Sequence, residues 1–295
     1  MRQDNQFQMT YCRLVRALLI FWLSSLAPRL AAADAATKVD EFIAQAGEAF
    51  DQGRREEAFA LCARAIEADP KSVRALYVRG RFYAMDRQAE KAVADYGAAL
   101  KLDPGAALIY QQRGIEQFKL GRVEEALADF DHYIELVPDE APSHWQRGIA
   151  CYYAKRYGAG RRQFELHQTV NPDDVENAVW HFLCVARGAG LEKARESLMK
   201  VGEDRRVPMN EIYALFAGTG SAADIMAAAK RGAPGPVELN QRLFYADLYI
   251  GLYHEAAGDD KSAREHILKA ANEYKVDNYM GDVARVHARL LRKAQ

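Results

Sequence analysis

A spacing of 34 residues recurs through the first half of the sequence and constrains the fold more than any other feature. Prolines lie at positions 70, 104, 138 and 172. A fixed period of this length is typical of solenoids, in which each repeat buries its apolar face against its neighbours. Other residue types recur with the same spacing at other phases: Gly80, Gly114 and Gly148, each preceded by Arg; Ala58, Ala92 and Ala126, followed by Gly160; Cys62, followed by Tyr96, Phe130 and Phe164.

Each copy of the repeat has the pattern of two amphipathic helices joined by a short polar turn. In the second copy the apolar spacing predicts helices over residues 73–85 and 89–102. Proline lacks the amide hydrogen and disfavours helix in the residue before it, so the recurrent proline ends one hairpin and starts the next. A glycine inside a helix costs about 1 kcal/mol relative to alanine, so its return at one phase predicts closely packed backbones. We expect the small residues to face these glycines, and the aromatic residues to fill the layer between successive hairpins.

These residues resemble the tetratricopeptide repeat (TPR) pattern W-x2-L-G-x2-Y…A-x3-F…P. The resemblance covers about residues 39–172, although Ala46 and Cys62 depart from the pattern in the first copy and His144 replaces an aromatic residue in the fourth. It implies an all-α fold, a right-handed TPR-type α-solenoid of helix hairpins with a C-terminal capping helix. The third copy carries the pattern as Tyr110, Arg113, Gly114, Ala126, Phe130 and Pro138.

The sequence divides into four segments. Residues 1–33 are predicted to be a signal peptide, and residues 34–172 four regular TPR repeats. The strict spacing ends at Pro172 while helical periodicity continues, so residues 173–236 are predicted to form degenerate helical hairpins. Their helices are expected at 175–187, 191–201, 210–217 and 221–230, with Ser221 as an N-cap. After the Gly- and Pro-rich break at 232–236, residues 237–295 are expected to hold a TPR-like hairpin (239–256 and 260–272) and a capping helix (282–292).

The signal peptide is indicated by the order of residue types at the N-terminus. Arg13 and Arg16 precede the apolar run at 17–27, Pro28 breaks that run, and alanines at 31–33 supply the small-residue cleavage pattern. The alternative is an uncleaved anchor, but the run is short against the ~20 residues needed to span a bilayer. We therefore expect a soluble exported protein of the periplasm or cell envelope, with no integral membrane span after cleavage.

The C-terminal third is similar to the NlpI-type TPR proteins of bacterial envelopes. This resemblance implies an adaptor that presents cell-wall hydrolases to an envelope protease, and a homodimer. Members of that family are typically lipid-anchored, whereas no cysteine here follows the apolar run closely enough to be lipidated. The similar residues are Trp180, Phe216 to Gly218, and Phe244, Tyr245, Tyr249, Gly251 and Tyr253 leading into Gly258-Asp259.

The resemblance also implies where a partner protein binds, because the first helix of each TPR hairpin lines a concave groove. Aromatic residues beside basic ones suit an extended or helical segment of acidic character. Two alternatives remain: Trp145 and Tyr152 pack between hairpins, or the chain is a structural homodimer formed through Tyr245, Tyr249 and Tyr253 without a groove function. The predicted partner-binding groove comprises Arg74, Tyr77, Arg81, Gln111, Phe118, Lys119, Trp145, Gln146, Tyr152 and Tyr153.

No pattern in the sequence predicts catalysis, a metal or a cofactor. His181 and Cys184 share a helix face but supply neither four zinc ligands nor a nucleophile with an oriented base. The pair would gain a catalytic interpretation only if it converged with acidic groups in a cleft. The formal net charge of −1 includes four arginines before residue 34, so the exported chain is acidic and unsuited to nucleic acid.

The three cysteines that follow the signal peptide are too few for a disulfide framework. Each of Cys62, Cys151 and Cys184 is expected to pack as a small apolar side chain. A disulfide between Cys151 and Cys184 remains open, because both are expected on neighbouring helices.

Overall fold

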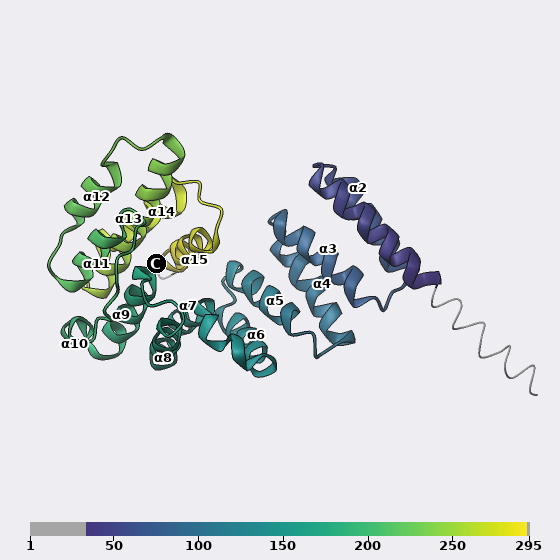
Figure 1. The fold of residues 1–295 in the computed structure, drawn as a ribbon, viewed down its shortest axis with the longest axis horizontal. Coiled ribbons are helices and arrows are strands. Elements are labelled where there is room, and N and C mark those ends of the chain that lie inside the picture. Colours follow the sequence, from purple (N-terminus) through teal and green to yellow (C-terminus); the bar gives the residue numbers. More distant parts are fainter. Residues whose placement is uncertain (1–33, 294–295) are drawn as a thin grey trace, which may run out of the picture. The chain divides into compact units, whose positions relative to one another are not determined.

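The structure is a computed structural model that describes residues 34–293, and these form helices joined by turns, without a strand (Figure 1). The signal peptide predicted at residues 1–33 lies outside the described residues. The chain divides into two compact units, one ending at Asp103 and the other beginning at Pro104. None of the helices in the described range is both long enough and apolar enough to cross a membrane.

The first unit contains a helix over residues 34–51, followed by α2 (Arg55–Ala68), α3 (Val73–Met85) and α4 (Ala89–Leu102). The last two helices occupy the residues predicted for the second repeat. Ser72 caps α3 by accepting a hydrogen bond from the Ala75 amide at 3.2 Å. The core of this unit is small, and in it the Phe50 and Phe82 rings stack with centroids 4.2 Å apart.

The second unit contains the third and fourth repeats and everything that follows them. The helix pairs predicted at 239–256 and 260–272 are present, and the first begins three residues earlier, at Pro236. Its elements are α5 (Ala107–Lys119), α6 (Val123–Leu136), the 3₁₀ helix η1 (Pro138–Ser143), α7 (Trp145–Tyr153), α8 (Tyr157–Gln168), α9 (Val175–Ala189), α10 (Leu191–Glu196), α11 (Met209–Ala217), α12 (Ala222–Lys230), α13 (Pro236–Ala256), α14 (Asp260–Asn272) and α15 (Tyr279–Lys293).

The recurrent glycines allow the close helix packing that their spacing predicts. A Cβ added to Gly114 would lie 2.6 Å from Cε1 of Phe130 and 3.2 Å from the carbonyl oxygen of Ala126. Phe130 also meets His144 of the next repeat, with ring centroids 4.8 Å apart. The aromatic residue therefore lies between two hairpins, as expected. Its ring fits there because glycine has no side chain.

A repeated ion pair accompanies each of these glycines in the second and third repeats. Arg79 binds Asp95 through two hydrogen bonds, at 2.7 and 2.8 Å, and Arg113 binds Asp129 in the same way at 2.6 and 2.8 Å. Both carboxylates are buried, so the pairing satisfies charges that would otherwise be costly to bury. In the fourth repeat Arg147 binds Asp131 instead.

One expected helix is shorter than predicted. The helix expected over 191–201 ends at Glu196, and the chain after it bonds to other elements: Gln168 Nε2 donates to the Lys200 carbonyl at 2.8 Å. In the fourth repeat the chain forms η1 over Pro138–Ser143, and the first helix, α7, begins at Trp145. Ser221 does cap α12, in a reciprocal capping box with Asp224.

Candidate functional site

The predicted groove residues of the first unit lie on α3 and leave a basic and aromatic face. Arg81 is exposed, and its guanidinium lies 5.8 Å from the centre of the Tyr77 ring. No carboxylate between residues 34 and 293 pairs with Arg81, whereas Arg74 pairs with Asp40 on the helix over residues 34–51. This face therefore keeps one uncompensated positive charge next to an aromatic ring.

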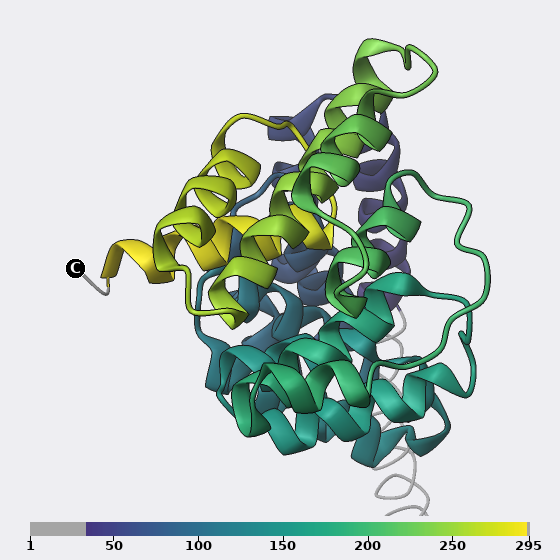
Figure 2. The same cartoon turned by 90° about the vertical axis from the view of Figure 1, so that its left-hand side faces the viewer.

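The predicted groove residues of the second unit converge instead on the C-terminal helix of the same chain. α15 contacts α5 and packs on α14, and it lies beside α5 in both views (Figures 1 and 2). The Tyr279 ring lies 5.4 Å from Phe118, stacked, and 5.2 Å from Trp145, edge-on. Residue 279 thus inserts between two aromatic residues predicted to anchor a partner.

Polar contacts hold the middle of α15 to α7 and α13. The Tyr153 hydroxyl and Nδ1 of His287 are 3.0 Å apart, and Nε2 of His287 lies 3.6 Å from Oε1 of Glu255. The Tyr152 hydroxyl donates to Oε2 of Glu255 at 3.2 Å. Burial raises the pKa of both tyrosines well above their usual range, so each stays protonated and able to donate.

Two of the residues predicted to line the groove are buried. Phe118 is 0% exposed and stacks on Tyr279 of α15, and Tyr152 is 5% exposed and bonds to Glu255 of α13, so neither ring is open to a partner in this structure. The ammonium of Lys119 pairs with Glu116 at 2.6 Å, and the Lys119 carbonyl accepts a hydrogen bond from Arg289 on α15. Gln111 and Gln146 are half-buried on α5 and α7.

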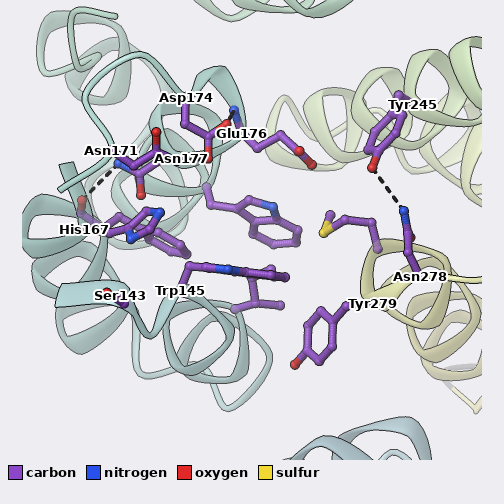
Figure 3. A pocket seen from close by; sticks show the side chains of 14 residues that line it. Ser143, Trp145, His167, Asn171, Asp174, Glu176, Asn177, Tyr245, Asn278 and Tyr279 are labelled. Atoms are coloured by element: carbon purple, nitrogen blue, oxygen red, sulfur yellow. Dashed lines mark hydrogen bonds between the residues drawn. The ribbon is translucent and has the colours of Figure 1, made fainter. Parts of the chain in front are cut away.

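A cavity of about 350 Å³ lies next to this helix-bound surface, within the second unit (Figure 3). Helices α7, α8 and α9 form one side of it, and α13 and the start of α15 form the other. Aromatic rings of Trp145, Trp180, Tyr245 and Tyr279 line it, and no lysine or arginine does. The cavity has the size of ligand pockets, roughly 300–1,000 Å³.

Carboxylates lie along the α9 side of the cavity. Glu176 accepts a hydrogen bond from the Tyr249 hydroxyl at 2.5 Å and pairs with Arg206 at 2.6 Å. Burial raises the pKa of Glu176 above its ordinary value, and the positive charge of Arg206 opposes that rise. Arg206 also pairs with Asp174 and Asp204, so one guanidinium serves three carboxylates.

Three polar groups of residues that line the cavity have no hydrogen-bond partner between residues 34 and 293. Asn177 donates from Nδ2 to the Phe164 carbonyl at 3.1 Å, which leaves its Oδ1 unpaired. Nε1 of Trp180 and the hydroxyl of Tyr279 are also unpaired. Asn177 and Trp180 are buried, and polar groups buried without a partner are rare enough to call for an explanation.

The pair considered for catalysis is not activated. His181 lies on α9 with Nε2 3.5 Å from Glu165, and burial lowers its pKa. Burial raises the pKa of the Cys184 thiol well above its usual range, so the thiolate needed for attack is scarce. All three described cysteines are free and buried, and residues 34–293 hold no group of three or more His, Cys, Asp or Glu side chains placed to bind a metal.

The tyrosines expected at a homodimer interface are engaged within the chain. Tyr249 is 0% exposed and Tyr245 is 9% exposed, so a second copy cannot bind through their rings. The Tyr253 hydroxyl accepts a hydrogen bond from Arg195 at 2.7 Å. Tyr245 and Tyr249 belong to the interior of the second unit, and Tyr253 packs half-buried against it.

Two features of the site were not predicted from the sequence. α15 was expected only to cap the solenoid, although its apolar residues Val283, Val286 and Ala288 recur on more than one face and indicate burial on two sides. The cavity brings α9 together with α13 and α15, which are distant in sequence. Only the spacing of Glu176, Asn177 and Trp180, which share one side of a helix, pointed to it.

Comparisons with known proteins agree with this architecture. Residues 43–107 match the family model of the tetratricopeptide repeat. A tetratricopeptide repeat protein from Parabacteroides merdae matches 87% of this chain and 99% of its own, at 16% identity and a TM-score of 0.57. MamA protein matches 55% of this chain and 88% of its own, at 16% identity and a TM-score of 0.51. No curated protein matches the chain by sequence.

At these identities the solved structures show the fold alone. Together with the helical architecture, they establish the chain as an all-α solenoid of the TPR type. A TPR fold indicates a scaffold for contacts between proteins.

Proposed function

We propose that this protein is an exported interaction scaffold, which binds a segment of a partner protein on the first-helix faces of its TPR hairpins. The observation that carries this proposal is the way α15 is held. Phe118 and Trp145 contact α15 through aromatic rings, and Tyr153 contacts it through a hydrogen bond, as anchor residues at interfaces do. α15 is an amphipathic helix of this same chain, and we propose that a helix of a partner binds in the same way.

Two faces take part in the proposed binding. The face of α3, with Tyr77 and Arg81, is suited to an acidic segment because Arg81 is exposed and has no carboxylate partner among the described residues. The face of α5 and α7 becomes available only when α15 leaves. An external helix must then compete with a tethered one, whose effective concentration is high.

The proposed role is binding, with no catalysis and no cofactor. It is supported by the protonated state of the buried thiols, since burial raises the pKa of Cys62 and Cys151 to about 11. The similarity of the C-terminal third to NlpI-type proteins makes an adaptor between cell-wall hydrolases and an envelope protease the specific form that we propose. Homodimer formation is not part of the proposal, because Tyr245 and Tyr249, expected at its interface, are buried.

A peptide of residues 276–293, which spans α15, tests the groove directly. We expect the labelled peptide to bind the full chain weakly, because the chain's own helix occupies the surface. A variant with Tyr279→Ala and His287→Ala should release that helix and bind the peptide tightly, as measured by fluorescence anisotropy. Adding Phe118→Ala to the released variant should remove binding again. Circular dichroism must show that each variant keeps its helical content.

If the released and folded variant does not bind the peptide, the surface has no capacity to hold a free helix and the groove proposal fails. The α3 face is tested separately by capture of proteins from an envelope extract with the full chain. An Arg81→Glu variant should lose the acidic partners, whereas Lys101→Glu on α4, also exposed, should keep them. Export is tested by the N-terminal sequence of the secreted chain, expected to begin near Asp34.

A further inference from the structure

The cavity between α9 and α15 has an excess of negative charge that the chain itself does not balance. Asp174 and Glu176 line it, and Asp204 shares their only cationic partner, Arg206. Arg206 is not among the lining residues. Asp204 does not line the cavity, and the two lining carboxylates share the one guanidinium with it, so their negative charge is only partly balanced. In a partly buried place the attraction of this charge for a cation is stronger than in water.

The walls of the cavity have the chemistry of a cation site as well. Trp145, Trp180, Tyr245 and Tyr279 present aromatic rings, whose faces attract ammonium and guanidinium groups. Figure 3 shows Trp145 and Tyr279 close together at one side of the cavity and the Glu176 side chain on another. An alkyl chain with a positively charged end would meet aromatic walls along its length and a carboxylate at its tip.

Asn177 provides a second, independent sign of a missing ligand. This residue is 4% exposed, its amide nitrogen is used by the Phe164 carbonyl, and its Oδ1 accepts no hydrogen bond from any described residue. An unpaired buried acceptor costs about 1–3 kcal/mol. Ammonium and guanidinium groups carry only donors, so such a group can donate to Oδ1 of Asn177.

We propose that this cavity binds an organic cation, an ammonium or guanidinium group on an aliphatic stem, between Glu176, Asn177 and the rings of Trp145 and Tyr279. An anion is disfavoured by the lining carboxylates, and a neutral apolar ligand would leave Asn177 unpaired. The cation can be a free diamine or the lysine or arginine side chain of a partner. The site does not depend on the proposed groove function, because it exists with α15 in place.

Tryptophan fluorescence reports almost exclusively on this cavity. The chain has three tryptophans, and Trp145 and Trp180 both line the cavity. In a full chain carrying Trp22→Phe, we expect a saturable fluorescence change on titration with putrescine or with N-acetyl-lysine methylamide. The neutral isostere N-acetyl-norleucine methylamide should give no saturable change. Tighter binding of putrescine identifies a free amine as the ligand, and tighter binding of the lysine derivative identifies a presented side chain.

Two carboxylate variants complete the test. Glu176→Gln removes the charge while keeping an acceptor for Tyr249, and we expect the affinity for the cation to fall by about tenfold. Glu192→Gln, an exposed position on α10, should bind as the parent does. Far-UV circular dichroism and the midpoint of thermal unfolding identify a variant that has failed to fold. If Glu176→Gln does not fold, the test uses Asn177→Leu instead, which keeps all charges and should also weaken cation binding.

Three results would overturn the proposal. The first is the absence of a saturable signal with either cation at millimolar concentration, which means that the cavity holds water only. The second is equal binding of the norleucine derivative, which identifies an apolar pocket. The third is unchanged cation affinity in the folded Glu176→Gln and Asn177→Leu variants.

Discussion

At the scale of single residues, two contacts hold the helices of the second and third repeats together: a glycine packed against an aromatic ring, and an arginine paired with an aspartate. Gly114 has no Cβ where the edge of the buried Phe130 ring lies, and the same contact recurs between Gly148 and Phe164. Sixteen residues separate the members of each pair, and sixteen also separate Arg113 from Asp129. One face of the second helix in a hairpin therefore receives both the glycine and the arginine of the first.

A methyl group added at this contact should destabilise the protein. In Gly114→Ala the Cβ would lie 2.6 Å from the Phe130 ring, and overpacking a buried contact costs about 1–3 kcal/mol. Gly47→Ala is the matched control, because it also lies inside a helix but its Cβ would meet nothing within 4 Å. We expect the control to be stabilised by up to about 1 kcal/mol. Urea unfolding measures both, and equal changes in the two variants would contradict the packing argument.

Glu255 should make stability depend on pH. Burial opposes ionisation of this carboxyl, but hydrogen bonds from His287 and Tyr152 hold its pKa below the ordinary value of 4.5. A carboxyl with a lowered pKa in the folded state contributes stability above its unfolded pKa and loses it as the pH falls further. Between pH 7 and pH 3 we therefore expect the parent to lose more free energy of unfolding than Glu255→Gln does, as measured by urea titration at each pH. Parallel pH profiles would show that Glu255 contributes nothing.

At the scale of elements, α15 is the helix on which access to the proposed groove depends. It starts beside the cavity at Tyr279, contacts α7 through His287 and reaches α5 through Arg289. A helix that sits on a TPR surface both closes the end of the solenoid and occupies its ligand position. Release of α15 would therefore expose apolar surface and the proposed groove at the same time.

Removing the anchor at position 279 should loosen this helix specifically. Tyr279→Ala deletes the half-buried ring between Phe118 and Trp145, and we expect a loss of up to about 3 kcal/mol, the lower end of the cost for a fully buried aromatic side chain. We expect amide hydrogen exchange in α15 to accelerate about 100-fold, with α3 and α4 unchanged. Leu290→Ala, on the exposed side of the same helix, is the control and should leave the exchange rates nearly unaltered. Similar acceleration in both variants would mean that the helix is not anchored at residue 279.

At the scale of the whole molecule, each of the two compact units has its own hydrophobic core. The large cluster that includes Phe118, Trp180 and Tyr249 belongs entirely to the unit that begins at Pro104. The clusters around Phe50 and Val39 belong to the unit that ends at Asp103. A small core buries a smaller share of its surface and is correspondingly less stable.

We therefore expect unfolding in more than one step. Trp145 and Trp180 report on the second unit, whereas far-UV circular dichroism reports on all helices. In the chain with Trp22→Phe, loss of helix on urea titration should begin at lower urea than the change in tryptophan fluorescence. Coincident transitions would show instead that the two units unfold cooperatively.

Much of the fold could be predicted because the repeat places its information close together in sequence. Pro104 and Pro138, the glycines and the aromatic residues act within one hairpin or its neighbour, so the helix bounds of the second repeat follow from local spacing. Errors arose where a distant segment intervened. The chain after Glu196 bonds to α8 and to the turn that precedes α9 rather than continuing its helix.

The sequence by itself determined the class of this protein, because a 34-residue period with glycine, aromatic and proline at fixed phases allows little other than stacked helix hairpins. It also predicted that Phe118, Trp145 and Tyr153 line a groove for an extended or helical segment of a partner, which stays a prediction. Only the tertiary structure decided that α15 contacts these residues, and that a cavity with carboxylates and aromatic walls lies beside it. The physical reason is that such contacts join residues more than a hundred positions apart, and no local periodicity encodes which distant face an amphipathic helix will cover.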